Sequence, residues 1–198
     1  GIYIAKSGAN FHGQPLATVI DYAKLALTSV TLITNKRVFS ILDRAQSYGL
    51  PQDLAADPEG GDTGLMITQY AASARAAESR ILATPASVSS VSTAANQEDY
   101  VSMGSIGALH LRKCLYNLEM IIGVELLIAV RALQMTQENL PEELNVLGQG
   151  TNVVYEHVNQ LMPPVFEDQY LRLDMEKAVD IVRSGKIIEL VREELARR

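Results

Sequence analysis

The sequence is poor in cysteine, in aromatic side chains and in clustered positive charge. Of 198 residues only Cys114 is a cysteine, tryptophan is absent, and aromatic residues make up 6%. A single thiol cannot form an internal disulfide, which fits a reducing compartment such as the cytoplasm. The net charge of -6 and the lack of a basic run argue against nucleic acid or an anionic membrane surface as a partner.

Long apolar runs and the short signatures of common enzyme classes are also missing. The longest apolar run, residues 120–130, contains Glu125 and is too short to cross a bilayer, which takes ~18 residues or more. There is no Gly-rich phosphate loop beyond the fragment Gly-Gln-Gly at 148–150, and no nucleophile elbow. No metal site is expected, because the histidines are far apart and lack cysteine neighbours: His12, His110 and His157.

What the sequence does contain is helical periodicity along most of its length. Apolar residues recur at helical spacing, no run of strands is found, and 47% hydrophobic composition suits one globular domain. Asp62 or Thr63 is expected to cap the second helix, and Asp174 the fifth. The pattern predicts an all-α fold with helices over about residues 16–45, 64–83 and 105–137, one ended by Pro163 and Pro164, one from Asp174 to Val182, and a closing amphipathic helix.

The third predicted helix has a centre that is apolar on nearly all sides. Residues 120–130 read Met-Ile-Ile-Gly-Val-Glu-Leu-Leu-Ile-Ala-Val, a composition typical of a helix buried all round. A chain of this size has too few other elements to surround such a rod, so we expect a partner chain or an oligomer. Glu125 lies within this stretch, and we expect it to be a paired structural carboxylate rather than a site residue.

A long stretch without helical or strand periodicity, residues 84–104, separates the second and third helices. Loops of this length in a compact domain are uncommon and are usually functional or disordered. Its valines and low charge favour an ordered loop that presents the polar cluster at 96–100. Taken alone, the cluster also fits an exposed helix N-terminus whose acids favour the helix dipole. Glu98 and Asp99 are neighbours whose side chains diverge, so at most one of them is expected to face a site.

A second polar cluster, residues 7–15, precedes the first helix and reads Ser-Gly-Ala-Asn-Phe-His-Gly-Gln-Pro. By composition it fits either a packed turn anchored by Phe11 or part of a binding site. Its Asn-Phe-His segment, the stretch from Pro-Ala-Ser-Val to Asn-Gln-Glu-Asp and Val-Ser-Met-Gly, and the C-terminal part from residue 148 resemble the aromatic amino-acid ammonia-lyase family, especially its histidine-type members. The resemblance covers almost the whole chain. It implies a long-helix bundle of the fumarase/aspartase-like type, shared within a homotetramer.

This resemblance also implies a reaction and roles for particular residues. The family eliminates ammonia with an electrophilic methylidene-imidazolone (MIO) group, made from its own Ala-Ser-Gly, and a tyrosine base. By the resemblance Glu98 is the catalytic carboxylate facing the substrate, Asn96 and Gln97 orient the site, and Phe11 lines the pocket. Glutamate at 98 fits histidine lyases, which convert L-histidine to urocanate, and tyrosine aminomutases. Tyr100 stands where histidine is usual in the histidine enzymes, which leaves the substrate open.

No Ala-Ser-Gly triplet occurs anywhere in the chain. We therefore expect residues 1–198 to be the C-terminal helical portion of a lyase that carries no prosthetic group of its own and is inactive alone. Its expected partners are the N-terminal portion, as a separate or cleaved chain, and further copies in a tetramer-like assembly. The alternatives are a tyrosine or phenylalanine ammonia-lyase, a 2,3-aminomutase with the same prosthetic group, or a non-catalytic helical scaffold.

Overall fold

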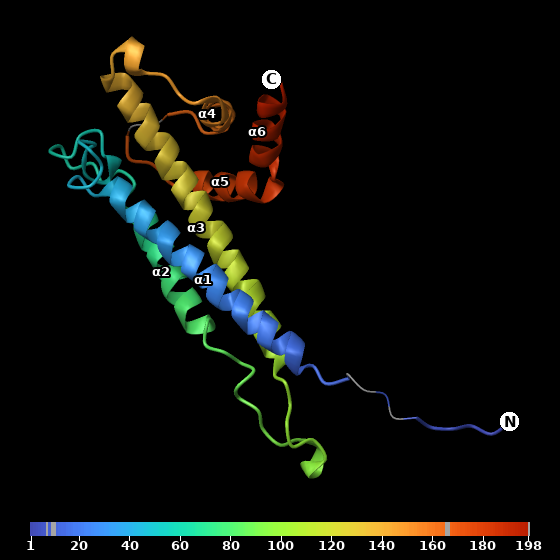
Figure 1. Cartoon of the computed structure of the whole chain (residues 1–198). Helices are drawn as coiled ribbons and strands as arrows, with labels where there is room; N and C mark the ends of the chain where they lie inside the picture. The colour runs from blue at the N-terminus through green and yellow to red at the C-terminus, as the bar shows by residue number, and fades with distance from the viewer. Residues whose placement is uncertain (7, 9–10, 165–166, 198) are drawn as a thin grey trace.

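The computed structural model describes residues 1–6, 8, 11–164 and 167–197, and in that part of the chain it contains helices and no strand. Helices α1 to α3 lie side by side as an elongated bundle, and α4 to α6 pack beside the C-terminal half of α3 (Figure 1). The predicted all-α fold is confirmed. The α-helices are α1 Gln14–Leu42, α2 Met66–Leu82, α3 Gly104–Asn139, α4 Gln149–Leu161, α5 Arg172–Ser184 and α6 Lys186–Ala196, with 3-10 turns at Gln52–Leu54, Ala94–Asn96 and Glu142–Leu144.

Helix α1 turns polar residues toward the bundle and many apolar residues away from it. Leu16 and Val19, two of the residues whose spacing predicts this helix, are 66% and 62% exposed. The predicted helix is confirmed, but between residues 21 and 34 every buried position is polar, so the apolar residues there do not mark the buried face. The buried positions recur every three or four residues instead: Ala17, Asp21, Lys24, Thr28, Thr31, Thr34, Val38 and Leu42.

The composition of α1 also satisfies the criteria for a membrane span. Its 29 residues include an 18-residue window of mean hydropathy 1.5, of which 28% is buried. The longest unbroken apolar run, residues 120–130, does not lie in α1, because polar residues interrupt the apolar residues of this helix. One such helix is weak evidence for a membrane, since core helices of soluble proteins and N-terminal signal sequences share its length and composition.

Helix α2 begins at Met66, so the prediction that Asp62 or Thr63 caps it is wrong. The N-cap residue is Leu65, which makes no side-chain capping bond. The backbone N–H groups of Thr63 and Gly64 instead donate to the carboxylate of Asp168, over N to O distances of 2.9 to 3.2 Å. Asp168, which is distant in the chain, thus binds backbone N–H groups at the place where a local cap was expected. It also connects the loop before α2 with the loop before α5.

Helix α3 is the central rod, 36 residues long and about 54 Å from end to end. Its Ile121, Val124 and Ile128 are buried against α1 and α2, whereas Ala129 on the same stretch is exposed. Glu125 accepts hydrogen bonds from both Nε and Nη2 of Arg37 on α1, so its predicted structural pairing is confirmed. The remaining elements of the chain leave part of this rod uncovered.

Helices α4 to α6 form a second layer on α3. Helix α5 begins at Arg172 and its N-cap is Leu171, so the prediction that Asp174 caps it is wrong; Asp174 accepts a bond from Gln169 instead. The backbone of α5 approaches α3 closely at Gly123, where an added Cβ would lie 2.6 Å from Cγ2 of Val179. Helix α6 packs mainly on α4, after a left-handed residue at Gly185.

Candidate functional site

The loop between α2 and α3 extends from the end of the bundle at which α1 begins (Figure 1). Its tip is exposed along the whole polar cluster, residues 96–100. Helix α3 begins only at Gly104, so the alternative in which this cluster forms a helix N-terminus is wrong. The tip contains local turns and one backbone bridge, between Thr93 and Glu98, and these set the positions of its side chains.

Glu98 is held by a strained turn. Thr93 and Glu98 exchange two backbone hydrogen bonds of 2.9 and 3.3 Å, and the Thr93 hydroxyl donates to the Glu98 carboxylate at 2.9 Å. The residues between them, Ala94, Ala95 and Asn96, have φ of 51°, 53° and 68°. Left-handed conformations of this kind cost about 1–3 kcal/mol each and cluster at functional sites. The turn therefore fixes the Glu98 carboxylate while leaving it exposed.

Phe11 lies on the segment that leads into α1, and its side chain is 89% exposed. The alternative in which Phe11 anchors a packed turn is therefore wrong. Of the predicted segment 7–15, residues Ser7, Ala9 and Asn10 lie outside the described residues. An 89% exposed aromatic ring is free to line a pocket only if another molecule supplies the remaining walls.

The segment carrying Phe11 contacts the loop carrying Glu98 through their neighbours. Nδ1 of His12 accepts the Gln14 backbone N–H at 3.1 Å, so its Nε2 carries the proton and donates to the Tyr100 carbonyl at 3.0 Å. The two rings also stack, with centroids 5.8 Å apart. The structure thus brings the two predicted clusters together, although Phe11 and Glu98 themselves make no contact with each other.

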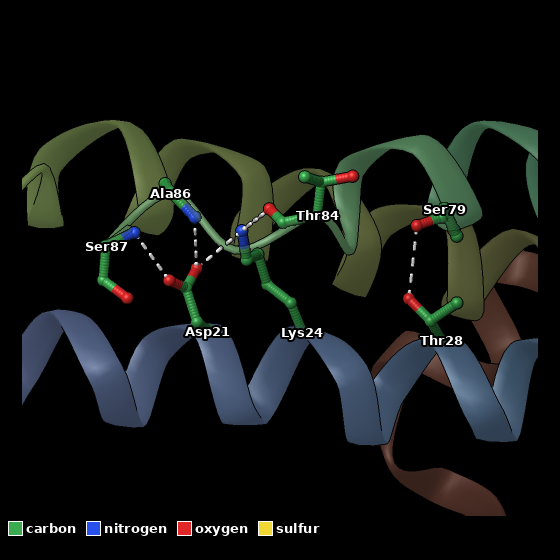
Figure 2. Close-up of polar contacts among 7 residues, drawn as sticks. All are labelled: Asp21, Lys24, Thr28, Ser79, Thr84, Ala86 and Ser87. Carbon is green, nitrogen blue, oxygen red and sulfur yellow. Dashed lines mark hydrogen bonds and ion pairs between the residues drawn. The ribbon is translucent and has the colours of Figure 1, made fainter. Parts of the chain in front are cut away.

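The loop is also attached to α1 by a buried pair that its sequence context does not reveal. Lys24 and Asp21, one helical turn apart, bind the backbone of residues 84 to 87, and Thr28 donates to the Ser79 carbonyl farther along α1 (Figure 2). Burial by itself would raise the pKa of Asp21. Bonds from Lys24 and from the Ser87 and Ala86 N–H groups outweigh that effect and hold the pKa well below its ordinary value.

The chemistry available at this end of the molecule is that of one fixed carboxylate beside amides and an aromatic ring. Glu98 can accept a proton or pair with a cationic group, and Asn96 and Gln97 can donate and accept hydrogen bonds. In the described ranges no three His, Cys, Asp or Glu side chains gather closely enough to hold a metal ion. All the predicted site residues are on the surface, so the site is open in this chain.

Comparison with known proteins defines the class. The family model for aromatic amino acid lyases matches residues 4–160, and the chain belongs to this family. Among relatives, it is 36% identical to histidine ammonia-lyase 1 of Fusobacterium nucleatum over 191 residues, which is 96% of this chain and 36% of that protein. The family predicted from the sequence is therefore confirmed.

Solved structures agree on the fold. Tyrosine aminomutase from Streptomyces globisporus superposes with a TM-score of 0.87 at 33% identity, over 98% of this chain and 36% of that one. Histidine ammonia-lyase from Trypanosoma cruzi gives 0.86 at 30% identity, over 98% and 37%. The chain thus spans just over a third of the length of these relatives.

Proposed function

We propose that this chain is the C-terminal portion of an ammonia-lyase that eliminates ammonia from an aromatic amino acid, with L-histidine, which would give urocanate, as the first candidate substrate. The carrying observation is the open site: Glu98 is fixed by Thr93 and the strained turn, yet Glu98 and Phe11 both face outward. A carboxylate held in place but not enclosed fits a site that another chain completes.

The prosthetic group of this proposal comes from the other chain. This sequence has no Ala-Ser-Gly from which an MIO group could form. When bound, the group supplies an electrophile, and the exposed ring of Phe11 suits an apolar wall beside it. The residues of this chain therefore fit a complementary role: they surround the group and the substrate, and they do not generate the group.

Each site residue then has a role that its side chain can perform. The Glu98 carboxylate pairs with the imidazole or the amine of the substrate and holds or moves a proton there. The Asn96 and Gln97 amides orient the substrate through hydrogen bonds. The backbone of Tyr100 helps to keep this tip beside Phe11, through the bond from His12.

The outward face of α1 supports the proposed partners. Tyr22 and Ile33 are 73% and 58% exposed on this helix, and such contiguous apolar surface marks an interaction site. We assign this face and the uncovered part of α3 to the N-terminal portion of the lyase and to further copies in a tetramer. The net charge of -6 disfavours nucleic acid and anionic membranes as partners. We also propose that the enzyme is cytoplasmic.

Reconstitution tests the proposal. The chain is co-expressed with the N-terminal portion of a histidine ammonia-lyase that contains Ala-Ser-Gly, and urocanate is followed by absorbance. The assembly should release ammonia, whereas this chain alone should not. In the assembly Glu98→Gln should lower the rate by roughly 10²- to 10⁴-fold, the usual contribution of a general acid or base.

The neighbouring Asp99→Asn is the matched control, because its side chain diverges from that of Glu98, and it should retain most of the activity. A Glu98→Gln rate within a factor of about two of the wild type would remove Glu98 from the mechanism, since acid–base groups contribute far more. Turnover by this chain alone would refute the two-chain site.

A 2,3-aminomutase is the second candidate, because the solved relatives include a tyrosine aminomutase with a TM-score of 0.87. The two activities differ in product: an aminomutase returns the amine to the β-carbon, whereas a lyase releases it as ammonia. Incubation of the assembly with histidine and with tyrosine, followed by product analysis, separates them. A chain that binds neither a second polypeptide nor an amino acid would instead be a scaffold.

A further inference from the structure

Both ends of the candidate loop lie on the same short stretch of α1. Where the chain leaves α2, residues 84 to 87 bind the side chains of Asp21 and Lys24. Where it enters α3, the backbone of Gly104 and Gly107 lies against α1. A Cβ added to Gly107 would be 3.3 Å from Cγ2 of Ile20 and 3.7 Å from Oδ1 of Asp21.

The first of these attachments is polar, and the two side chains of α1 that make it are buried. Lys24 has no exposed surface and Asp21 has 4%. Nζ of Lys24 lies 2.7 Å from Oδ1 of Asp21 and donates to the Thr84 carbonyl at 2.9 Å. The Asp21 carboxylate accepts the N–H groups of Ala86 and Ser87 at 3.1 and 2.8 Å (Figure 2). These three hydrogen bonds to the loop all involve its backbone atoms.

Such an arrangement specifies position more strongly than an apolar contact would. Apolar contacts are not directional, whereas two N–H bonds to one carboxylate are directional and define where the backbone of residues 86 and 87 lies. A buried ion pair adds little stability compared with apolar residues of the same shape, but losing one partner is costly. Its main effect is therefore to fix where the loop begins.

We propose that Asp21 and Lys24 are positioning residues: they fix the start of the 84–103 loop on α1 and so place Glu98 relative to Phe11, which precedes the same helix. This inference rests on the proposed function. Two further contacts span the same junction. Gln14 donates to the Ser87 carbonyl at 3.4 Å, and His12 donates to the Tyr100 carbonyl. The N-terminal end of α1 therefore follows directly on the segment that carries Phe11, and its side chains hold the loop that carries Glu98.

Amide hydrogen exchange on the chain itself gives the first test. In the wild type, Ala86 and Ser87 should exchange more slowly than the exposed tip at 96–100, because their N–H groups are bound and buried. In Asp21→Asn, exchange over residues 84–103 should rise by about tenfold or more. Exchange at the bundle core, at Ile121 and Val124, should rise only by the factor that the loss of global stability sets, which urea unfolding of the same variant measures.

Asp168→Asn is the matched control for this experiment. Asp168 also accepts two successive backbone N–H groups, those of Thr63 and Gly64, but at the opposite end of α2. It should speed exchange at those two residues and leave 84–103 unchanged. Loop exchange that is unaffected by Asp21→Asn, or affected equally by both variants, would overturn the proposal, as would fast exchange at Ala86 and Ser87 in the wild type.

Kinetics of the reconstituted lyase give the second test. Misplacement of a catalytic group by about 1 Å can cost 10²-fold, so Asp21→Asn should lower kcat per assembled site by roughly 10- to 100-fold. A purely structural role would lower the fraction of assembled sites and leave kcat per site unchanged. If the single variant does not fold, the double variant Asp21→Asn with Lys24→Met serves instead, since it buries no unpaired charge.

The two tests separate the two claims. If the wild-type assembly has no lyase activity but the exchange pattern holds, the proposed function fails and the anchoring of the loop stands. If the wild type is active, the loop loosens, and kcat per site is unchanged, then the positioning role is overturned and the proposed function stands.

Discussion

The two loops that flank α2 are held by the same local chemistry in opposite surroundings. Before α2, Asp168 accepts the N–H groups of Thr63 and Gly64 on an exposed surface. After α2, Asp21 accepts those of Ala86 and Ser87 inside the bundle. Only the buried aspartate has a lysine beside it. At Asp168 water can replace either hydrogen-bonding partner, whereas at Asp21 burial keeps water from doing so.

This difference shows how burial changes the effect of a similar pair of backbone N–H bonds. The Thr63 backbone N–H is the main cause that lowers the pKa of Asp168. At Asp21 burial acts in the opposite direction, and Lys24 with the two N–H groups must overcome it to lower the pKa. The buried set of bonds is the one at the base of the loop that carries the candidate site, where the position of the loop matters for the proposed chemistry.

The largest expected effect comes from removing the charge that compensates the buried aspartate. Lys24→Met leaves Asp21 as an unpaired buried carboxylate, and breaking such a pair costs about 3–5 kcal/mol. Urea unfolding at neutral pH measures the loss. Arg172→Met, which breaks an ion pair on α5 whose arginine and glutamate side chains are 68% and 52% exposed, is the control and should change the free energy of unfolding far less. Equal losses in the two variants would erase the contrast between buried and exposed pairs.

A smaller effect is expected on the acid side of the stability profile. The pKa of Asp21 is lower in the folded chain than in the unfolded chain, where it is about 3.9. Its contribution to the free energy of unfolding is therefore complete above about pH 5 and is lost as the pH falls below about 4, by roughly 1–3 kcal/mol in all.

Unfolding measured at several pH values between neutral and acidic should therefore show a steeper fall for the wild type than for Asp21→Asn. The slope that remains in the variant comes from Glu78, Asp168 and other carboxylates; Lys113 is the main cause that lowers the pKa of Glu78. Two parallel profiles would mean that Asp21 does not titrate differently in the folded chain.

The smallest effect is expected at Asp168, the exposed one of the two aspartates. Asp168→Asn removes a charge that water can replace, so the unfolding midpoint should change less than in any variant of Asp21 or Lys24. The local consequence should still be visible as faster amide exchange at Thr63 and Gly64. A midpoint shift as large as that of Lys24→Met would show that the loop before α2 contributes to global stability.

The sequence predicts the helices because their apolar spacing and their breaks are local properties. Pro15 lies in the first turn of α1, Gly148 is the N-cap residue of α4, and the predicted proline pair follows the end of α4. The similarity to a known family along almost the whole chain also identifies the class of protein, because it too is read directly from the sequence. The paired state of Glu125 is also predictable, since a buried acid requires a partner.

The features that the sequence does not reveal depend on contacts between distant residues. The caps expected at Asp62 or Thr63 and at Asp174 fail because the helices begin elsewhere: the N-cap residues are Leu65 and Leu171, and neither makes a side-chain capping bond. The anchoring pair is hidden because Asp21 and Lys24 read as ordinary surface residues of a helix. Their burial follows from the inward face of α1, which its apolar residues do not mark. The candidate site residues were identified by similarity, and their roles stay predictions.

The inside-out character of α1 has a consequence for how the protein is made. During synthesis α1 is complete about a hundred residues before α3, its main neighbour. At 5–20 residues per second that interval is roughly 5–20 s, during which the inward face of α1 lacks its main partner. The inward face is then satisfied by α2 and α3, while the outward face keeps its apolar side chains exposed. Under the proposed function, the partner that covers this face also protects it from chaperones and aggregation in the cell.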